Sequence, residues 1–195
     1  MYYGALESAG IPKRELMVHR VEKARDTQEE TKEQFKTALD QFTAVTNFNG
    51  GDLEVVYNEL NDEYEASVDQ AETVRKRIDD IKDVSAALFE EWEEEIEEFS
   101  SASLKRSSKT QLSETKRQYR QLINAMESAE SKLDPVLTVF KDQVLYLKHN
   151  LNARAISSLK NELSGIQSDV SSLIDAMESS IDEANNFINS MEQNK

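Results

Sequence analysis

The sequence has no cysteine and, among 195 residues, only two prolines and five glycines. The lack of cysteine excludes disulfide bonds, thiolate metal sites and cysteine nucleophiles, and it fits either a reducing compartment or an envelope protein that folds without disulfides. Because proline and glycine interrupt helices most often, their scarcity favours long helices over a sheet or a disordered chain. We therefore expect one all-α domain over residues 1–195.

Long apolar runs are also missing. No stretch approaches the roughly 20 apolar residues of a membrane-spanning helix, and the opening MYYGALESAG lacks the basic and apolar regions of a signal peptide. The net charge of −15 argues against a nucleic-acid partner, because phosphate binding requires clustered lysine and arginine. Residues 51–100 carry 18 acidic and 4 basic side chains, whereas residues 101–150 carry 5 acidic and 9 basic ones. These two segments are electrostatic complements.

Two long segments repeat apolar or small residues at alternating spacings of three and four, the pattern of helices that supercoil around one another. The first segment has Leu53, Tyr57, Leu60, Tyr64, Ser67, Ala71, Val74, Ile78, Ile81, Ser85, Leu88, Trp92, Ile96 and Phe99. The second has Leu104, Ser108, Leu112, Thr115, Tyr119, Leu122, Met126, Ala129, Leu133, Val136, Phe140, Val144, Leu147 and Leu151. If the chain folds back on itself at SSAS, residues 100–103, each apolar position of the first segment lies opposite one of the second, with Trp92 opposite Leu112 and Val74 opposite Ala129. The pattern predicts an antiparallel hairpin.

The outer segments mirror each other in the same way, with Ala24 opposite Met177 and Phe35 opposite Ile166. The sequence thus predicts an elongated, antiparallel up-down-up-down four-helix bundle with coiled-coil-like packing. Its helices are expected at about 12–47, 53–99, 104–150 and 153–191.

Pro135 interrupts the third of these helices, because proline lacks the N–H group that a helix interior requires. The pairing of the repeats is the same on both sides of Pro135. We therefore expect a kink near Pro135 rather than an inserted loop.

The outer helices are shorter than the hairpin, so residues from about 89 to 115 are expected to project as a two-helix tip. The stretch LFEEWEEEIEE at 88–98 places seven glutamates there, opposite the basic residues that follow the turn. One interpretation is a solvated hairpin whose ion pairs neutralise each other. The other is an acidic face that binds a basic partner segment or weakly attracts Ca²⁺ or Mg²⁺, although the spaced Asp/Asn/Gly loop of a calcium site is missing.

Two aromatic residues favour a contact site at the tip. Phe89 and Trp92 cannot both be covered by two helices alone, and exposed aromatics with an acidic rim are typical of protein interfaces. The alternative is that Tyr2, Tyr3 and Leu6 fold over them. Tip residues that would bind a protein partner, or a second copy of the chain, are Phe89, Glu90, Trp92, Glu94, Glu95, Phe99, Lys105 and Arg106.

A second candidate is the polar corner between KHNLNAR at 148–154 and NFNGGD at 47–52. Helix capping explains these residues, because asparagine caps helices readily. The alternative is a small polar binding site made by Asn49, Asp52, His149, Asn150, Asn152 and Arg154.

Other site chemistry has little support in the sequence. Di-iron bundles use Glu-x-x-His pairs, but Leu16 and Tyr146 stand three residues before the two histidines. No glycine begins a phosphate-binding loop, and no nucleophile elbow is present. We therefore expect no catalytic residue, no metal site and no cofactor, and a protein that is not an enzyme.

Four stretches carry a resemblance to a known family: YYGALESAGIPKREL, FNGGDLE, ALFEEWEEEIE and DQVLYLKHNLNARAI. With them the chain resembles an uncharacterised bacterial family, a domain of unknown function found mainly in marine gammaproteobacteria. Members typically begin with a signal peptide, often of the lipoprotein type, before a similar YYG start. The resemblance implies a location in the cell envelope, in the periplasm or as a periplasm-facing lipoprotein whose signal precedes Met1. It implies nothing about activity.

The expected function is that of a non-enzymatic structural or adaptor protein of the envelope, which presents its tip to a protein partner. The alternative is an amphipathic lipid-binding protein whose bundle opens on a membrane surface. Polar residues in the helix seams would loosen the core and permit this opening: Gln28, Thr31, Ser67, Ser85, Ser108 and Thr115.

Overall fold

The computed structural model describes residues 12–193, and this part of the chain contains helices, short connections and no strand. The helices are α2 (Lys13–Thr46), α3 (Leu53–Glu98), α4 (Ala102–Glu130), α5 (Leu133–His149) and α6 (Ala153–Gln193). The prediction of an all-α fold is confirmed for these residues.

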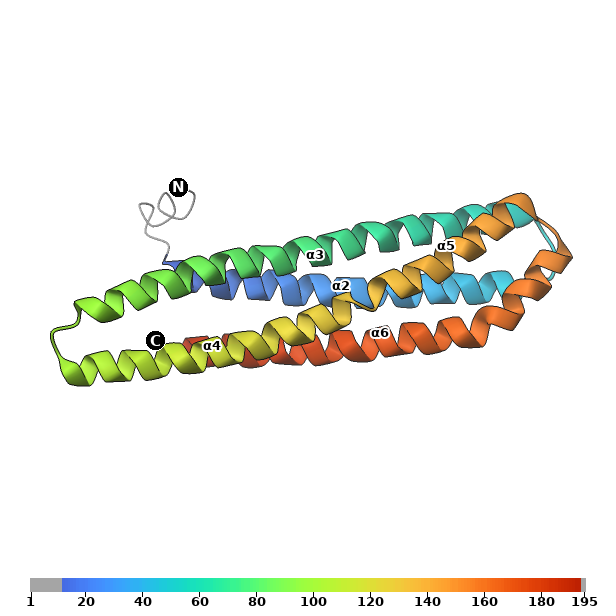
Figure 1. Cartoon of the computed structure of the whole chain (residues 1–195). Helices are drawn as coiled ribbons and strands as arrows, with labels where there is room; N and C mark the ends of the chain where they lie inside the picture. Colours follow the sequence, from blue (N-terminus) through green and yellow to red (C-terminus); the bar gives the residue numbers. More distant parts are fainter. Residues whose placement is uncertain (1–11, 194–195) are drawn as a thin grey trace.

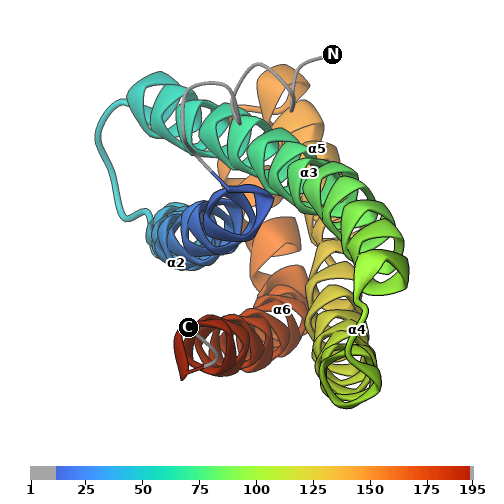
Figure 2. The same ribbon diagram turned by 90° about the vertical axis from the view of Figure 1, so that its left-hand side faces the viewer.

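The helices lie side by side along one long axis (Figure 1). The α2–α3 and α5–α6 connections lie at one end of the molecule, and the α3–α4 connection lies at the other. Seen along that axis, α2 packs against α3 and α6, and α4 packs against the same two helices from the other side (Figure 2). Each helix therefore packs against its neighbours in the chain, and the last packs against the first.

The connection between α2 and α3 depends on glycine. Gly50 and Gly51 have φ angles of +136° and +121°, a region that side-chain-bearing residues rarely adopt. Asp52 then caps α3, because its carboxylate accepts a hydrogen bond from the Glu54 backbone N–H at 3.0 Å. This capping satisfies one of the free N–H groups of the first turn.

The helix predicted at about 104–150 is two helices, α4 and α5, separated by a turn at Ser131 and Lys132. Both turn residues keep right-handed helical φ and ψ angles. Pro135 explains the interruption, because it offers no N–H to the Ser131 carbonyl four residues earlier and its ring crowds that group. The change of direction therefore begins before Pro135, and α5 leaves α4 at an angle (Figure 1).

The core runs between the helices for the length of the molecule. An aromatic layer in this core joins Phe35 and Phe42 of α2 to Phe140 of α5, whose ring centroid lies 6.4 Å from that of Phe35 and 6.2 Å from that of Phe42. All three side chains are at most 1% exposed. Polar groups are buried as well: the amide of Gln28 and the hydroxyl of Ser180 have no hydrogen-bond partner within the described residues.

The axial register of α2 against α6 differs from the pairing predicted from the sequence, in which Ala24 lies opposite Met177. Arg25 bonds to the Asn185 amide at 3.2 Å, and Lys32 pairs with Glu178 at 3.7 Å. The mirror pairing would place residues 176 and 169 opposite these side chains, so each contact lies nine positions further along α6. A heptad repeat looks the same after a shift of one heptad, and long side chains reach another turn. The repeat therefore predicts which sides of two helices face each other better than it predicts how far the helices are shifted along their axis.

Candidate functional site at the hairpin end

The end of the α3–α4 hairpin extends past the ends of α2 and α6 (Figure 1). The first turn of α2 reaches only the level of Glu91, which its Lys13 contacts at 3.0 Å. The last turns of α6 reach the level of Gln118, whose amide oxygen accepts a hydrogen bond from Ser190 at 2.7 Å. Residues 92–117, called the tip below, therefore project as two helices.

The exposed aromatic pair, one of the two alternatives that the sequence left open, is not formed, because Phe89 is buried at 9% exposure. Tyr119 packs edge-on against its ring with centroids 5.4 Å apart, and the Lys116 ammonium lies 5.4 Å from the ring centroid. Trp92 is half-buried, and its indole N–H donates to the Ser108 hydroxyl at 2.8 Å. The interpretation that Tyr2, Tyr3 and Leu6 cover these rings lies outside the described residues.

The exposed apolar residues of the tip are Phe99 and Leu104. Phe99 is 41% exposed and Leu104 is 56% exposed. Both continue the hairpin seam beyond the ends of α2 and α6. The sequence pattern predicted Phe99 but not Leu104 as a site residue. Its place as the first seam position after the turn is the signal that could have identified it.

The acidic run is only partly neutralised inside the molecule. Glu97 pairs with Lys105 at 2.7 Å and with Lys109 at 3.4 Å, and Glu93 pairs with Lys116. The hydrogen bond from Lys105, with a second from Lys109, lowers the pKa of the Glu97 carboxyl below its ordinary value. Four glutamates of the run form no ion pair within residues 12–193: Glu90, Glu94, Glu95 and Glu98. Arg106 is exposed, and its guanidinium donates to the Ala102 carbonyl at 3.3 Å.

A groove of about 400 Å³ lies between α3 and α4 at the base of the tip. Its floor is apolar, formed by the buried residues Ile96 and Leu112. Its rims carry charge, with two glutamates on α3 and Lys109, Lys116 and Arg120 on α4. The groove can therefore accept side chains with an apolar stem and a charged end.

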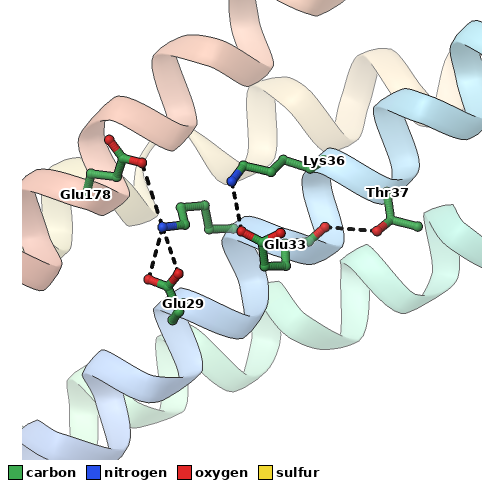
Figure 3. Close-up of polar contacts among 6 residues, drawn as sticks. Glu29, Glu33, Lys36, Thr37 and Glu178 are labelled. Atoms are coloured by element: carbon green, nitrogen blue, oxygen red, sulfur yellow. Dashed lines mark hydrogen bonds and ion pairs between the residues drawn. The ribbon is translucent and has the colours of Figure 1, made fainter.

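A second cluster of charges lies in the middle of the molecule and has a structural role. The buried ammonium of Lys32 pairs with Glu29 at 2.8 Å and also reaches Glu178 of α6 at 3.7 Å (Figure 3). The hydrogen bond to Glu29 raises the pKa of Lys32 above its ordinary value and outweighs the opposing effect of burial. Because this lysine stays charged and paired, the cluster joins α2 to α6 and offers no free base.

The polar corner is explained by helix capping. The Asn152 side chain accepts hydrogen bonds from the backbone N–H groups of Arg154 and Ala155 at 3.0 and 3.1 Å. The Asn150 amide donates to the Tyr146 carbonyl at 2.9 Å, and Asp52 caps α3. Asn49, His149 and Arg154 are exposed. No hydrogen bond or ion pair joins any two of the six candidate side chains within the described chain.

Within residues 12–193, no group of three or more histidine, aspartate or glutamate side chains is placed to hold a metal ion. None of the helices in that range has a stretch long and apolar enough to cross a membrane.

Comparison with known proteins adds the family. The sequence profile of a family described as a protein of unknown function, DUF2959, matches residues 2–191. The chain belongs to this family. Membership in DUF2959 confirms the resemblance to an uncharacterised family, and the match includes both the tip and the polar corner. A search of the curated proteins finds no match to the chain. The family description names no activity.

Proposed function

We propose that this protein is a non-enzymatic adaptor or structural protein of the bacterial envelope: an up-down-up-down four-helix bundle that presents its tip to a protein partner. The family resemblance supports the envelope location, in the periplasm or as a periplasm-facing lipoprotein. The exposure of Phe99 and Leu104 is the observation that carries the proposal. Exposed apolar side chains with a polar rim are a common feature of protein-binding surfaces.

The charges around these two residues suit a basic partner segment. Glu94, Glu95 and Glu98 are exposed and form no ion pair within residues 12–193. A partner that places lysine or arginine beside its own apolar anchor would neutralise them. Rim charges of this kind speed association and select partners more than they add affinity.

Capture experiments with the full chain test this function. The double variant Phe99→Ser/Leu104→Ser is expected to lose a partner that the unaltered protein retains from an envelope extract, at least 10-fold by quantitative recovery, because the apolar anchors are gone. The matched control is Val55→Ser/Leu151→Ser, at the opposite end, where the side chains are 50% and 41% exposed. A partner lost equally from both variants, or from neither, would place the working surface elsewhere.

A lipid-binding function is the second candidate, and the unpaired amide of Gln28 favours it. This side chain is 1% exposed and has no partner for either amide atom, which weakens the core at that level. If the bundle opens on membranes, the full chain should float with anionic vesicles, and Gln28→Leu should reduce flotation by stabilising the closed form. The adaptor proposal predicts no flotation for either protein. If the unaltered chain floats with the vesicles and Gln28→Leu does not, the lipid-binding function is favoured over the adaptor function.

A further inference from the structure

The outer face of α3 and α4, which is turned away from α2 and α6, has no described helix beyond it (Figure 2). Glu91 marks the side of α3 that contacts Lys13 of α2. Glu93 lies two residues on, about 200° further around the helix, and pairs with Lys116 of α4 instead. The groove floored by Ile96 and Leu112 opens on this same outer face.

Charges of one sign predominate on each helix of the outer face, with exposed Lys76 three residues before the acidic series on α3 and exposed Glu114 within the basic series on α4. On α3, exposed carboxylates follow one another at spacings of four, seven and seven: Asp79, Asp83, Glu90 and Glu97. On α4, exposed cations follow at spacings of three, eight and three: Arg106, Lys109, Arg117 and Arg120. Such spacings keep side chains on one side of a helix. The face is therefore a predominantly acidic stripe beside a predominantly basic stripe.

Several charges in these stripes are unused within residues 12–193. Neither Asp83 nor Glu90 forms an ion pair there, and Arg120 has no carboxylate partner. Arg117 bonds only to the neutral amide of Gln121, at 3.2 Å. Glu97 and Lys109 form an ion pair with each other across the hairpin. Both stripes therefore contain charged side chains that are free to form ion pairs with another protein surface.

We propose that a second copy of this chain packs on this outer face, with α3 of each copy over α4 of the other. A symmetric dimer needs a surface that complements itself. A two-fold axis along the hairpin brings each acidic stripe onto a basic stripe, whereas a two-fold axis across it would bring like charges together. Charge therefore selects the dimer in which both tips point the same way.

The size of the face fits a reversible dimer. Two helices about 10 Å wide, over the 19 residues from Asp79 to Glu97 at about 1.5 Å per residue, give a face of about 600 Å² per copy. Stable specific interfaces bury about 800 Å² per partner. Because this face is polar, we expect exchange between monomer and dimer and weakening by salt. The dimer goes beyond the proposed function, since it would set two tips side by side and give two-point binding to any partner.

Charge reversal in the full chain tests the geometry. The pairing of Arg75 with Glu130 places Glu90 within about two residues of the level of Arg117, and Asp83 within about two residues of the level of Arg120. Variant A is Asp83→Lys/Glu90→Lys, and variant B is Arg117→Glu/Arg120→Glu. Each alone is expected to dimerise about 10-fold or more weakly than the unaltered protein in sedimentation equilibrium at low salt. A 1:1 mixture of A and B is expected to regain dimers as A–B pairs, because both stripes are then complementary.

The control carries the same charge change elsewhere: Glu162→Lys/Asp169→Lys, two exposed carboxylates of α6 seven residues apart and without an ion pair in the described chain. It should dimerise like the unaltered protein. A monomeric unaltered protein, or an A–B mixture that associates no better than A or B alone, would overturn the dimer. Phe99→Ser/Leu104→Ser should still dimerise. If the dimer fails while that variant loses a captured partner, the proposed function stands without it.

Discussion

Phe140→Ala is expected to lower the free energy of unfolding by about 3–5 kcal/mol, one of the largest losses available to a single substitution in this chain. The ring is 1% exposed and lies between Phe35 and Phe42 of α2. Removing it leaves a cavity that the flanking helices cannot fill without shifting, and it deletes two aromatic contacts. Urea unfolding followed by circular dichroism measures the change, with an unaltered slope against denaturant.

Tyr146→Ala, in the same helix, is the matched control. Its side chain is 40% exposed, so its removal should change stability by no more than about 0.5 kcal/mol. If Phe140→Ala unfolds at the same urea concentration as Tyr146→Ala, the aromatic layer between α2 and α5 does not hold the helices together in solution.

Gln28→Leu is expected to raise the free energy of unfolding by about 1–3 kcal/mol, which runs against the usual effect of core substitutions. Both amide atoms of Gln28 are buried without a partner, so the folded state gives up their hydration without replacing it. Leucine has a similar volume and no polar group to bury. Thermal unfolding of the full chain would show a higher midpoint temperature than that of the unaltered protein.

Gln34→Leu separates this effect from a general benefit of leucine in α2. The Gln34 amide donates to the Glu63 carboxylate at 2.7 Å, so the same substitution there removes a hydrogen bond and should bring no gain. A loss of stability in Gln28→Leu would contradict the expectation. It would show that the amide is paired in solution, for which an internal water is the simplest source.

The hairpin formed by α3 with α4 and α5 shows how much of the fold can be predicted from a sequence pattern. Seam residues such as Ile81, Leu122 and Phe140 are buried as the repeat predicts. Arg75 pairs with Glu130 at 3.0 Å, within two residues of the predicted pairing of Val74 with Ala129. The repeat works because helical periodicity decides which side of a helix is apolar, and the apolar side must be buried.

The candidate site was predictable in place but less so in detail. A long central hairpin with shorter outer helices implies a projecting end, and Phe99 is exposed there as expected. The burial of Phe89 was not predictable, because it depends on Tyr119 and Lys116 meeting its ring from the other helix. Which glutamates stay unpaired likewise depends on side-chain reach across the hairpin, a matter of a few ångströms that residue spacing does not encode.

The sequence by itself determined that this protein is all-α, that its helices begin and end near glycine, proline and capping residues, and that its middle segments carry opposite charge. These properties follow from local backbone preferences and from periodicity, both of which act over a few residues. Only the tertiary structure decided the axial register of α6 and the surfaces left uncovered. Those features arise where whole helices pack, and a repeating pattern allows several packings that only side-chain fit distinguishes.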